Sequence, residues 1–402
     1  MKYSSPCMTI VLFLFLIATS CQCTNEKDAG KKIKTFDLSV LPKAGSARLS
    51  DLGFVDIEYI PLETNEQSLI TGTKDIFFPV KISAVGNSYL IKRFNTILKF
   101  NRNGSFVARI GTVGRGPDEF TAAHDAGIYE KNQNIYLLAR WQEKFFVYSE
   151  KGELIRTFKI PFSPSEFSFC GDGILCYGEN HMGNIEYNYN MIDTGGRIIK
   201  SYINKYPFKN HDAYGIENEN LFYRFNNQLF KKEVYSDTIY LCGEEDFKAH
   251  LVIQVGDRLI TPQARSEFEG PDLAKNYIIP LKLFEFGDYV YYEFVYRFEL
   301  PDNVLVYSFI GSKKNNYQVL FDRSQGLIND LDGGPEILPR TTRDDNTIIA
   351  LVDALKLKTY VGSDAFKNSN PIYPDKKTKL ENLAKNIKDI DNPVLILVKM
   401  KH

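Results

Sequence analysis

The chain carries a near-regular series of glycine turns, each placed just after an apolar, aromatic-rich stretch. Gly104, Gly152 and Gly196 lie 48 and 44 residues apart. Gly326 follows 130 residues after the third, close to three further steps of similar length. A period of about 40–50 residues with several short strands per unit is typical of a β-propeller. The sequence therefore predicts an all-β fold, a six-bladed β-propeller of four-stranded antiparallel blades.

Two complete repeat units align around the first two of these glycines. In each unit two strands precede the glycine turn and one follows it, and matching positions are offset by 47 or 48 residues throughout. The predicted strands are 87–91, 96–100 and 106–110 in the first unit and 134–138, 144–148 and 154–158 in the second. A third unit spans 167–202, and a weaker fourth contains 221–223 and 238–241. Whole units repeat, which favours a ring of similar blades.

A ring of blades has to close, and the two ends of the chain supply strands for this. Val55–Tyr59 alternates apolar and acidic residues, and Val394–Lys399 is a continuous apolar run. Pairing a strand from one end with the blade from the other removes the exposed sheet edge. These two segments are therefore predicted to pair and close the propeller.

Two stretches depart from the strand pattern. Residues 256–290 break the rhythm and are interpreted as an insertion with a short helix around 265–272. Near the end of the chain, Leu380, Leu383 and Ile387 fall at helical spacing. This spacing predicts a short amphipathic C-terminal helix over 378–390.

The N-terminal region is predicted to be a targeting segment and a tether. Residues 1–20 have the apolar core of a signal peptide, and that core is too short to span a bilayer. Ala18, Thr19 and Ser20 precede Cys21 and resemble the lipobox of bacterial lipoproteins, in which the cysteine is lipidated; Ala18 departs from the usual leucine. The predicted organisation is 1–20 signal peptide, 21–49 lipidated tether and 50–402 propeller. An ordinary secretory signal with an incidental cysteine is the alternative.

Six cysteines are present, and two of them flank a turn. Cys170 and Cys176 lie on either side of a Gly-Asp-Gly hairpin signal. They either face each other and form a disulfide in an oxidising envelope, or are two buried thiols. Because the chain has no Cys-x-x-Cys pair, a zinc ribbon is excluded.

The segment Ile110–Phe120 is glycine-rich and lies between the first two units. It resembles the inter-blade segment of six-bladed propellers of the NHL and TolB-like groups. The strings Asp332–Pro335 and Asp391–Leu395 are similar to those of six-bladed propeller lipoproteins of Gram-negative gut bacteria. This resemblance covers about residues 50–400. It implies a lipid-anchored protein of the Gram-negative cell envelope, on the periplasmic or surface face of the outer membrane, and implies no settled activity.

The glycine-rich segment is not a phosphate cradle. It does not fit G-x-G-x-x-G, it lacks the Lys-Ser/Thr of a P-loop, and Pro117 follows Gly116 directly. A tight turn explains these glycines, because glycine permits positive φ and close backbone approach. The net charge of −1 implies no attraction to nucleic acid.

No metal or cofactor signature is present. The five histidines show neither H-x-x-x-H nor H-x-H spacing, so no metal site and no cofactor are predicted. Asp330, Asp332 and Glu336 resemble the start of a calcium loop, but the later ligands are missing and a turn explains the segment.

A small set of residues is predicted to reach one mouth of the ring, where propellers usually bind. The candidates are Arg115, His124, Arg140 and Trp141, which lie in or near inter-strand segments of the first two units. Surface salt bridges and rim packing are the alternative for these side chains. Trp141 is the single tryptophan, which weighs against a dedicated sugar-stacking face.

These observations favour a non-enzymatic, membrane-anchored binding module for a peptide, a protein or a glycan. The alternative is an envelope hydrolase or lyase whose site is assembled across blades. A central cluster of carboxyl or imidazole groups with shifted pKa values would favour that alternative. A structural role in a surface uptake complex is a third hypothesis.

Overall fold

A computed structural model describes Met1 and residues 33–70, 80–209, 215–216, 218–243, 245–297 and 305–401. The chain divides into two units, Met1–Ile33 and Lys34–His402. The predicted signal peptide and Cys21 lie outside the described residues. Among the described residues, no helix combines the length and apolarity that crossing a membrane requires.

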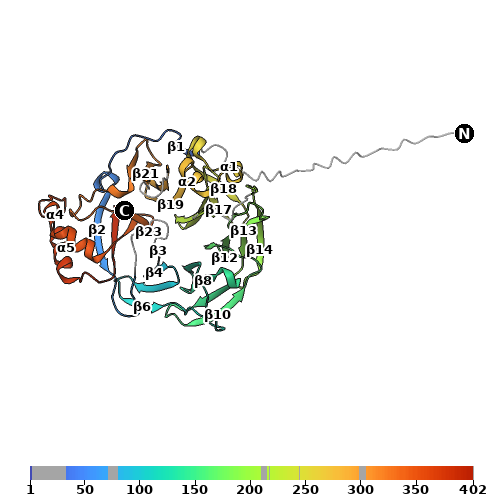
Figure 1. Cartoon of the computed structure of the whole chain (residues 1–402), viewed down its shortest axis with the longest axis horizontal. Helices are drawn as coiled ribbons and strands as arrows, with labels where there is room; N and C mark the ends of the chain where they lie inside the picture. Colours follow the sequence, from blue (N-terminus) through green and yellow to red (C-terminus); the bar gives the residue numbers. More distant parts are fainter. Residues whose placement is uncertain are drawn as a thin grey trace. The chain divides into compact units, whose positions relative to one another are not determined.

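Six β-sheets stand around a central axis like the blades of a propeller (Figure 1). Blade 1 contains β3 (Lys81–Val85), β4 (Ser88–Arg93), β5 (Thr96–Asn101) and β6 (Phe106–Arg109). Blade 2 contains β7 (Asp125–Ile128), β8 (Ile135–Ala139), β9 (Lys144–Tyr148) and β10 (Leu154–Lys159). Blade 3 contains β11 (Glu166–Cys170), β12 (Gly173–Tyr177), β13 (Tyr187–Ile192) and β14 (Ile198–Ile203).

Of the other three blades, blades 4 and 6 each include a strand from the N-terminal part of the chain. Blade 4 contains β15 (Asn220–Phe225), β16 (Gln228–Glu233), β17 (Thr238–Cys242), β18 (Phe247–Gln254) and β1 (Lys34–Asp37). Blade 5 contains β19 (Ile279–Phe286), β20 (Tyr289–Val295), β21 (Val306–Ser312) and β22 (Gln318–Asp322). Blade 6 contains β23 (Pro339–Asp344), β24 (Thr347–Val352), β25 (Val394–Met400) and β2 (Phe54–Pro61). The prediction of a six-bladed propeller is confirmed.

The ring closes where the sequence predicts. Strand β2 pairs antiparallel with β25, with Tyr59 opposite Ile396. Side chains of β25 alternate between the two neighbouring blade interfaces: Val394, Ile396 and Val398 pack in one apolar cluster, and Leu395 and Leu397 pack in another. A strand that is buried on both faces reads as a continuous apolar run, which explains this segment of the sequence.

Short helices join some of the strands. Helices α1 (Pro262–Glu267) and α2 (Gly270–Asn276) precede β19, and α3 (Ala354–Gly362), α4 (Asp364–Lys367) and α5 (Pro374–Asn386) lie between β24 and β25. Figure 1 shows α4 and α5 at the rim of the ring, beyond β2. The predicted C-terminal helix is therefore present, starting four residues earlier than expected, and it buries Leu380 and Ala384.

Two predicted boundaries are corrected. Residues 256–290 are not only an insertion, because β19, the first strand of blade 5, lies within them. The propeller also begins before residue 50: Lys34–Asp37 form β1, which adds to blade 4 as a fifth strand parallel to β18. Phe36 in this strand is buried against Phe309, so part of the predicted tether belongs to the fold.

The glycine turns are equivalent in three blades only. Gly104, Gly152 and Gly196 join the third and fourth strands of blades 1 to 3, all at positive φ. A Cβ on Gly104 would lie 2.1 Å from the carbonyl oxygen of Pro61, so no larger residue fits. Gly326 is different and follows the short helix η4 (Arg323–Gln325) after the fourth strand of blade 5. The interpretation of Gly326 as a blade turn is wrong, although the blade number is right.

The cysteine pair does not form a disulfide. Across the β11–β12 hairpin, Cys170 is opposite Gly173 and Cys176 is opposite Phe167. Cys170, Cys176 and Cys242 are buried thiols that are not in a disulfide. Of the two alternatives, the buried thiols are the correct one.

The strand order gives the ring two different faces. In a four-stranded meander the start of the first strand, the loop between the second and third strands, and the connection to the next blade all lie at one end. We call this end the strand-start face. The turns at Gly104, Gly152 and Gly196 lie at the opposite end, the glycine-turn face. First strands of neighbouring blades contact one another around the axis, so the starts of these strands gather at the centre of the strand-start face, a region that we call the inlet.

Candidate functional site

The four predicted site residues all lie on the strand-start face. Arg140 and Trp141 form the short helix η2 (Arg140–Gln142) between β8 and β9. His124 directly precedes β7, and Arg115 is exposed in the connection from blade 1 to blade 2. The structure brings His124, Arg140 and Trp141 into mutual contact, while Arg115 stands apart from them.

His124 supports the Trp141 loop. Its Nδ1 accepts a hydrogen bond from the backbone N–H of Arg140 at 3.2 Å, and its ring meets Trp141 edge-on with centroids 4.7 Å apart. Burial, followed by the positive charge of Arg140, lowers the pKa of His124. The Trp141 side chain itself is 74% exposed. His124 therefore holds a tryptophan ring out in solvent rather than burying it.

Arg140 extends toward blade 3. Its guanidinium pairs with Glu179, and His181 Nε2 lies 3.0 Å from the same carboxylate. The hydrogen bond that Glu179 accepts from His181 raises the pKa of His181, and the pKa of Glu179 is lowered by His181 and Arg140 in spite of its burial. This ion cluster joins blades 2 and 3 beside Trp141.

Blade 1 repeats the Arg-aromatic pair of blade 2. Arg93 and Phe94 lie 47 residues before Arg140 and Trp141, in the equivalent loop between β4 and β5. Phe94 is 58% exposed and has a φ of +49°, in a two-residue turn where glycine is favoured. A bulky side chain in this conformation costs about 1–2 kcal/mol. The Arg93 guanidinium lies 5.0 Å from the centre of the Phe94 ring, so the two side chains form one exposed Arg-aromatic pair.

Polar residues begin the first strands of four successive blades. Lys81, Asp125, Glu166 and Asn220 are the first residues of β3, β7, β11 and β15. Lys81 Nζ lies 2.5 Å from Asp125 Oδ1, and Asn220 Nδ2 donates to Glu166 Oε1 at 2.8 Å. The side chain of Lys81 is 49% exposed although it stands on an innermost strand, so solvent reaches the inlet.

Glu166 is the most perturbed carboxyl group at the inlet. Burial raises its pKa to about 8, with Lys81 and Asn220 opposing the shift and Asp125 and Glu179 adding to it. Tyr189 donates to Asn220 Oδ1 at 2.8 Å, which fixes the amide with its NH2 group toward Glu166. This raised pKa favours the protonated form of the Glu166 carboxyl near neutral pH.

The opposite side of the inlet, on blades 5 and 6, is cationic. Lys282 follows a bulge near the start of β19 and pairs with Glu293, and Arg340 is the second residue of β23. Arg323 Nε lies 3.2 Å from Glu293 as well. Burial lowers the pKa of Lys282 to about 8, and burial together with Arg323 lowers that of Arg340. Lys282 and Arg323 therefore share the buried carboxylate of Glu293.

The glycine-rich connection is a closed turn, as expected. The backbone N–H of Gly116 donates to Glu119 Oε2 at 2.8 Å, and the N–H of Gly114 donates to the carbonyl of Phe120. A Cβ on Gly114 would lie 1.9 Å from the Glu119 carboxylate. The carboxylate occupies the place that a phosphate would take.

The acidic segment near Asp332 is a turn as well. Asp332 Oδ1 accepts hydrogen bonds from Asn329 Nδ2 at 2.7 Å and from the N–H of Gly334 at 2.9 Å, and Asp330 accepts from Ser50. These contacts hold the chain between η4 and β23. Within the described part of the chain, no group of three His, Cys, Asp or Glu residues is placed to hold a metal ion.

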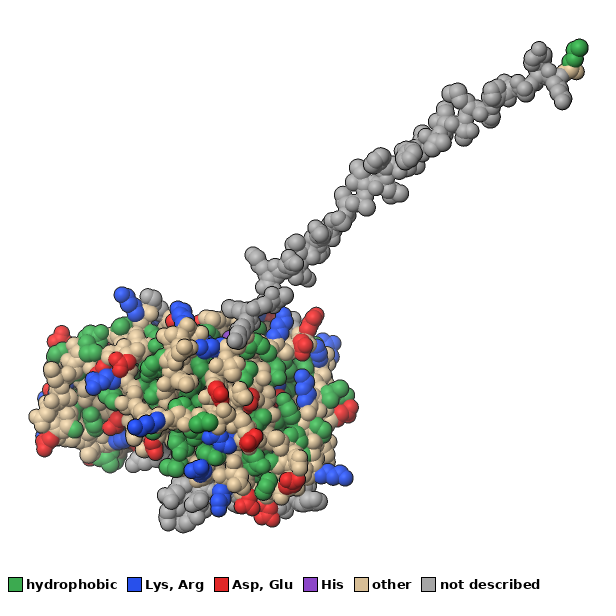
Figure 2. All heavy atoms as spheres, turned by 90° about the horizontal axis from the view of Figure 1, so that it is seen from above, with side chains coloured by type: hydrophobic (Ala, Val, Ile, Leu, Met, Phe, Trp, Pro, Cys, Tyr) green, Lys and Arg blue, Asp and Glu red, His purple; other side chains and the backbone are tan. Residues whose placement is uncertain are grey.

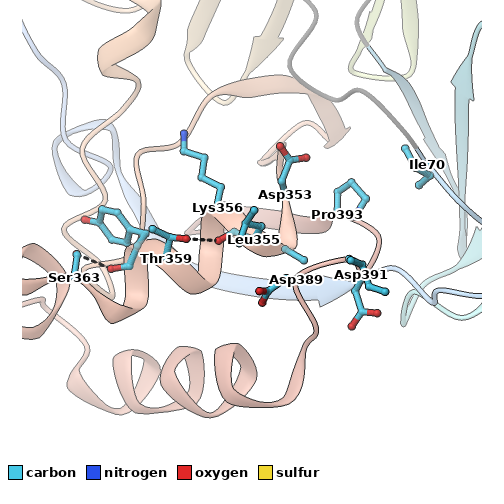
Figure 3. A pocket seen from close by; sticks show the side chains of 12 residues that line it. Ile70, Asp353, Leu355, Lys356, Thr359, Ser363, Asp389, Asp391 and Pro393 are labelled. Atoms are coloured by element: carbon cyan, nitrogen blue, oxygen red, sulfur yellow. Dashed lines mark hydrogen bonds between the residues drawn. The ribbon is translucent and has the colours of Figure 1, made fainter.

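A groove of about 830 Å³ lies away from the candidate residues (Figure 3). It runs between the start of α3 and the segment that leads into β25, with Ile70 at one end. Leu355 and Ile390 are exposed along it, and Lys358 pairs with Asp389 at 2.9 Å. On the side of the molecule drawn in Figure 2, acidic and basic side chains are interspersed with hydrophobic ones. Neither positive nor negative charge dominates that side of the molecule.

Sequence reasoning missed part of this site. Phe94 could have been found from the sequence, because it lies 47 residues before Trp141, at the offset that relates the two repeat units. The inlet residues carry a weaker signal, because Lys81, Asp125, Glu166 and Asn220 are four different residue types. Only the strand order brings them to one mouth.

The comparisons with known proteins agree with this fold. The matching family model is described as a domain of unknown function (DUF4934) and covers residues 33–399. A Bacteroides fragilis protein named as exported superposes with a TM-score of 0.67 at 18% identity, covering 92% of this chain and all of that one. A DUF4221 member from Bacteroides vulgatus gives a TM-score of 0.51 at 11% identity, covering 87% of this chain and 97% of that one. No curated protein matches.

Proposed function

The chain belongs to the DUF4934 family, and we propose that it is a non-enzymatic binding module of the cell envelope that holds a peptide or protein on its strand-start face. The observation that carries this proposal is the repeated Arg-aromatic pair, Arg93 with Phe94 and Arg140 with Trp141, on equivalent loops of two adjacent blades. Exposed tryptophan, other aromatic residues and arginine are the residue types that dominate binding energy at protein interfaces.

The surroundings of these loops support the same role. Val113, in the connection between blades 1 and 2, is also exposed, as is Arg115. His124 and the ion pair of Arg140 with Glu179 fix the Trp141 loop from beneath, so little side-chain freedom is lost on binding. A preorganised aromatic platform of this kind fits a peptide segment with aromatic or proline residues.

Substitution of the two aromatic residues tests this role. We expect Trp141→Ala and Phe94→Gly each to weaken partner binding at least tenfold, because each removes an exposed anchor. Phe94→Gly is expected to leave the free energy of unfolding within about 1 kcal/mol, because relief of the positive φ offsets the chain entropy that glycine adds. The measurement is crosslinked capture from the native envelope, followed by titration with the partner so identified.

Ile199→Ala is the matched control, since Ile199 is an exposed apolar residue on the outer strand β14. It should bind like the wild type. Capture of the same partner by both aromatic variants at wild-type affinity would refute the assignment of the binding face. Recovery of a glycan in place of a protein would refute the assignment of the partner.

The envelope location is part of the proposal. It rests on the signal-like residues 1–20, on the lipobox-like sequence before Cys21 and on the resemblance to NHL- and TolB-like propeller lipoproteins. Cys21→Ala is expected to abolish labelling of the protein by a fatty-acid analogue and to release it from membranes on fractionation. Labelling that persists in this variant would place the anchor elsewhere.

An envelope hydrolase or lyase is the second candidate, favoured by the inlet carboxyl of Glu166 with its pKa of about 8. It ranks second because the neighbouring carboxylates are occupied. Asp125 accepts from Lys81 and from the N–H groups of Ala126 and Phe167. Glu179 is held by Arg140 and His181. Both of these described carboxylates are therefore already bound, which weighs against their acting as a base beside Glu166.

A further inference from the structure

We propose that Cys170 and Cys242 are a redox-active thiol pair, which closes to a disulfide between blades 3 and 4 when a small organic disulfide acts as the oxidant. The two residues lie 72 positions apart in the chain and belong to different blades. The pair lies away from the strand-start face, so its chemistry is independent of what binds there.

Both thiols lie at the same end of the ring. Cys170 is the last residue of β11, and Cys242 is the last residue of β17. The first and third strands of a meander run in the same direction, so both cysteines lie toward the glycine-turn face. Cys170 Sγ donates a hydrogen bond to the backbone carbonyl oxygen of Cys242 at 3.6 Å. The sulfur of one cysteine therefore contacts the backbone from which the other thiol branches.

The two side chains share a cluster and a cavity. Cys170 and Cys242 are each 6% exposed and pack in one apolar cluster with Tyr189 and Leu229. Both also line a cavity of about 260 Å³ between blades 3 and 4. Cys176 is fully buried and packs in a different cluster, between blades 2 and 3. The cavity therefore gives an oxidant a route to the first two thiols and not to the third.

The backbone next to each cysteine suits a change in sulfur position. Gly171 follows Cys170 at a φ of +57°, and Gly243 follows Cys242 and donates its N–H to the carbonyl of Asp246. A disulfide needs Cα atoms about 4.4–6.8 Å apart and a defined dihedral angle. Strand ends beside glycine turns adjust more readily than strand centres. Rotation of the two side chains, with a small shift of these ends, brings the sulfurs to bonding distance.

The reaction is a thiol–disulfide exchange in two steps. One cysteine thiolate attacks a sulfur of the oxidant, breaks its S–S bond, releases one thiol and leaves a mixed disulfide. The second cysteine attacks the protein sulfur of that mixed disulfide and releases the other half of the oxidant as a thiol. The protein loses two hydrogen atoms and two electrons, which the oxidant gains. Burial raises the pKa of the Cys242 thiol, with Lys231 opposing the rise, so the exchange is slow at neutral pH.

Oxidation of the purified full-length protein with bis(2-hydroxyethyl) disulfide at pH 8.5 tests the pair. Digestion without a reducing agent, including cleavage at Asp172, separates Cys170 from Cys176. We expect a linked peptide that holds Cys170 and Cys242. The thermal midpoint should rise by about 5 °C, because the new bond closes a loop of 72 residues, and a reducing agent should reverse the rise.

Three single substitutions locate the reaction. Cys170→Ala and Cys242→Ala should each prevent both the link and the rise in thermal midpoint. Cys176→Ala removes a buried sulfur outside the cavity, so it is the matched control and should form the link like the wild type. The peptide map of the wild type decides the question even if a variant fails to fold.

Three results would overturn the proposal. They are two unmodified thiols after oxidation, a mixed disulfide that persists on one cysteine, and a link that joins Cys170 to Cys176. Each is distinct from failure of the proposed function, which is measured by partner capture with Trp141→Ala and Phe94→Gly.

Discussion

Truncation of the chain after Pro393 is expected to abolish cooperative folding of the propeller. Strand β25 is the third strand of blade 6 and lies between β24 and β2, so its loss leaves β2 without a partner and β24 paired with β23 alone. Its residues 394–398 are at most 1% exposed and pack into two separate apolar clusters. Each such side chain contributes about 1.5–3 kcal/mol by burial, and five of them approach the whole stability of a domain.

Removal of Lys34–Asp37 is the matched control for this truncation. Strand β1 adds only to the edge of blade 4, and Phe36 is its one buried side chain. We expect this variant to retain a cooperative thermal transition at a lowered midpoint. Circular dichroism melting and resistance to protease compare the two variants. A folded, cooperative protein without residues 394–402 would contradict the closure of the ring by β2 and β25.

The second large effect is expected at a buried ion pair between blades 3 and 4. Lys231 Nζ lies 2.7 Å from Glu233 Oε2, and both side chains are 4% exposed. Lys231 also lies 4.1 Å from the ring centre of Tyr189, and Asn188 donates to the other oxygen of Glu233 at 2.6 Å. Glu233→Gln keeps the shape and leaves the ammonium without its counter-charge. We expect it to lower the free energy of unfolding by about 3–5 kcal/mol.

A double substitution separates the charge from the packing. Lys231→Met combined with Glu233→Gln removes both charges and keeps the volume, so it should recover most of the lost stability. Denaturant titrations of the two single variants and the double variant give the coupling energy. A Glu233→Gln protein within about 1 kcal/mol of the wild type would show that the pair is solvated rather than buried.

The sequence predicts the ring well where each blade uses the same turn. Gly104, Gly152 and Gly196 recur because the chain turns there at positive φ beside a neighbouring backbone. Blade 5 makes its equivalent turn without glycine: Ser312 Oγ accepts from the N–H of Asn315, and Asn315 Oδ1 accepts from the N–H of Tyr317. Side-chain hydrogen bonds replace glycine in that turn. For this reason the series appeared to continue at Gly326, which is a different structure.

The candidate site is only partly predictable for a related physical reason. Trp141 and Arg140 could be predicted from the sequence, because an aromatic residue in a polar segment between two strands is unusual. Glu166 and Lys81 look like ordinary polar residues at the edge of a loop, and their meeting depends on the order of blades around the axis. The inlet forms only when the ring closes, so no local sequence pattern predicts it.

The central claim is that the strand-start face, and not the glycine-turn face, binds the partner. A photoactivatable amino acid at Val113 reports on the first face, and the same residue at Lys151 reports on the second, both positions being exposed. After irradiation of the native envelope, a specific crosslinked product is predicted from position 113 and not from position 151, and Trp141→Ala should remove it. A product from position 151 alone, or one that Trp141→Ala leaves unchanged, would contradict this account.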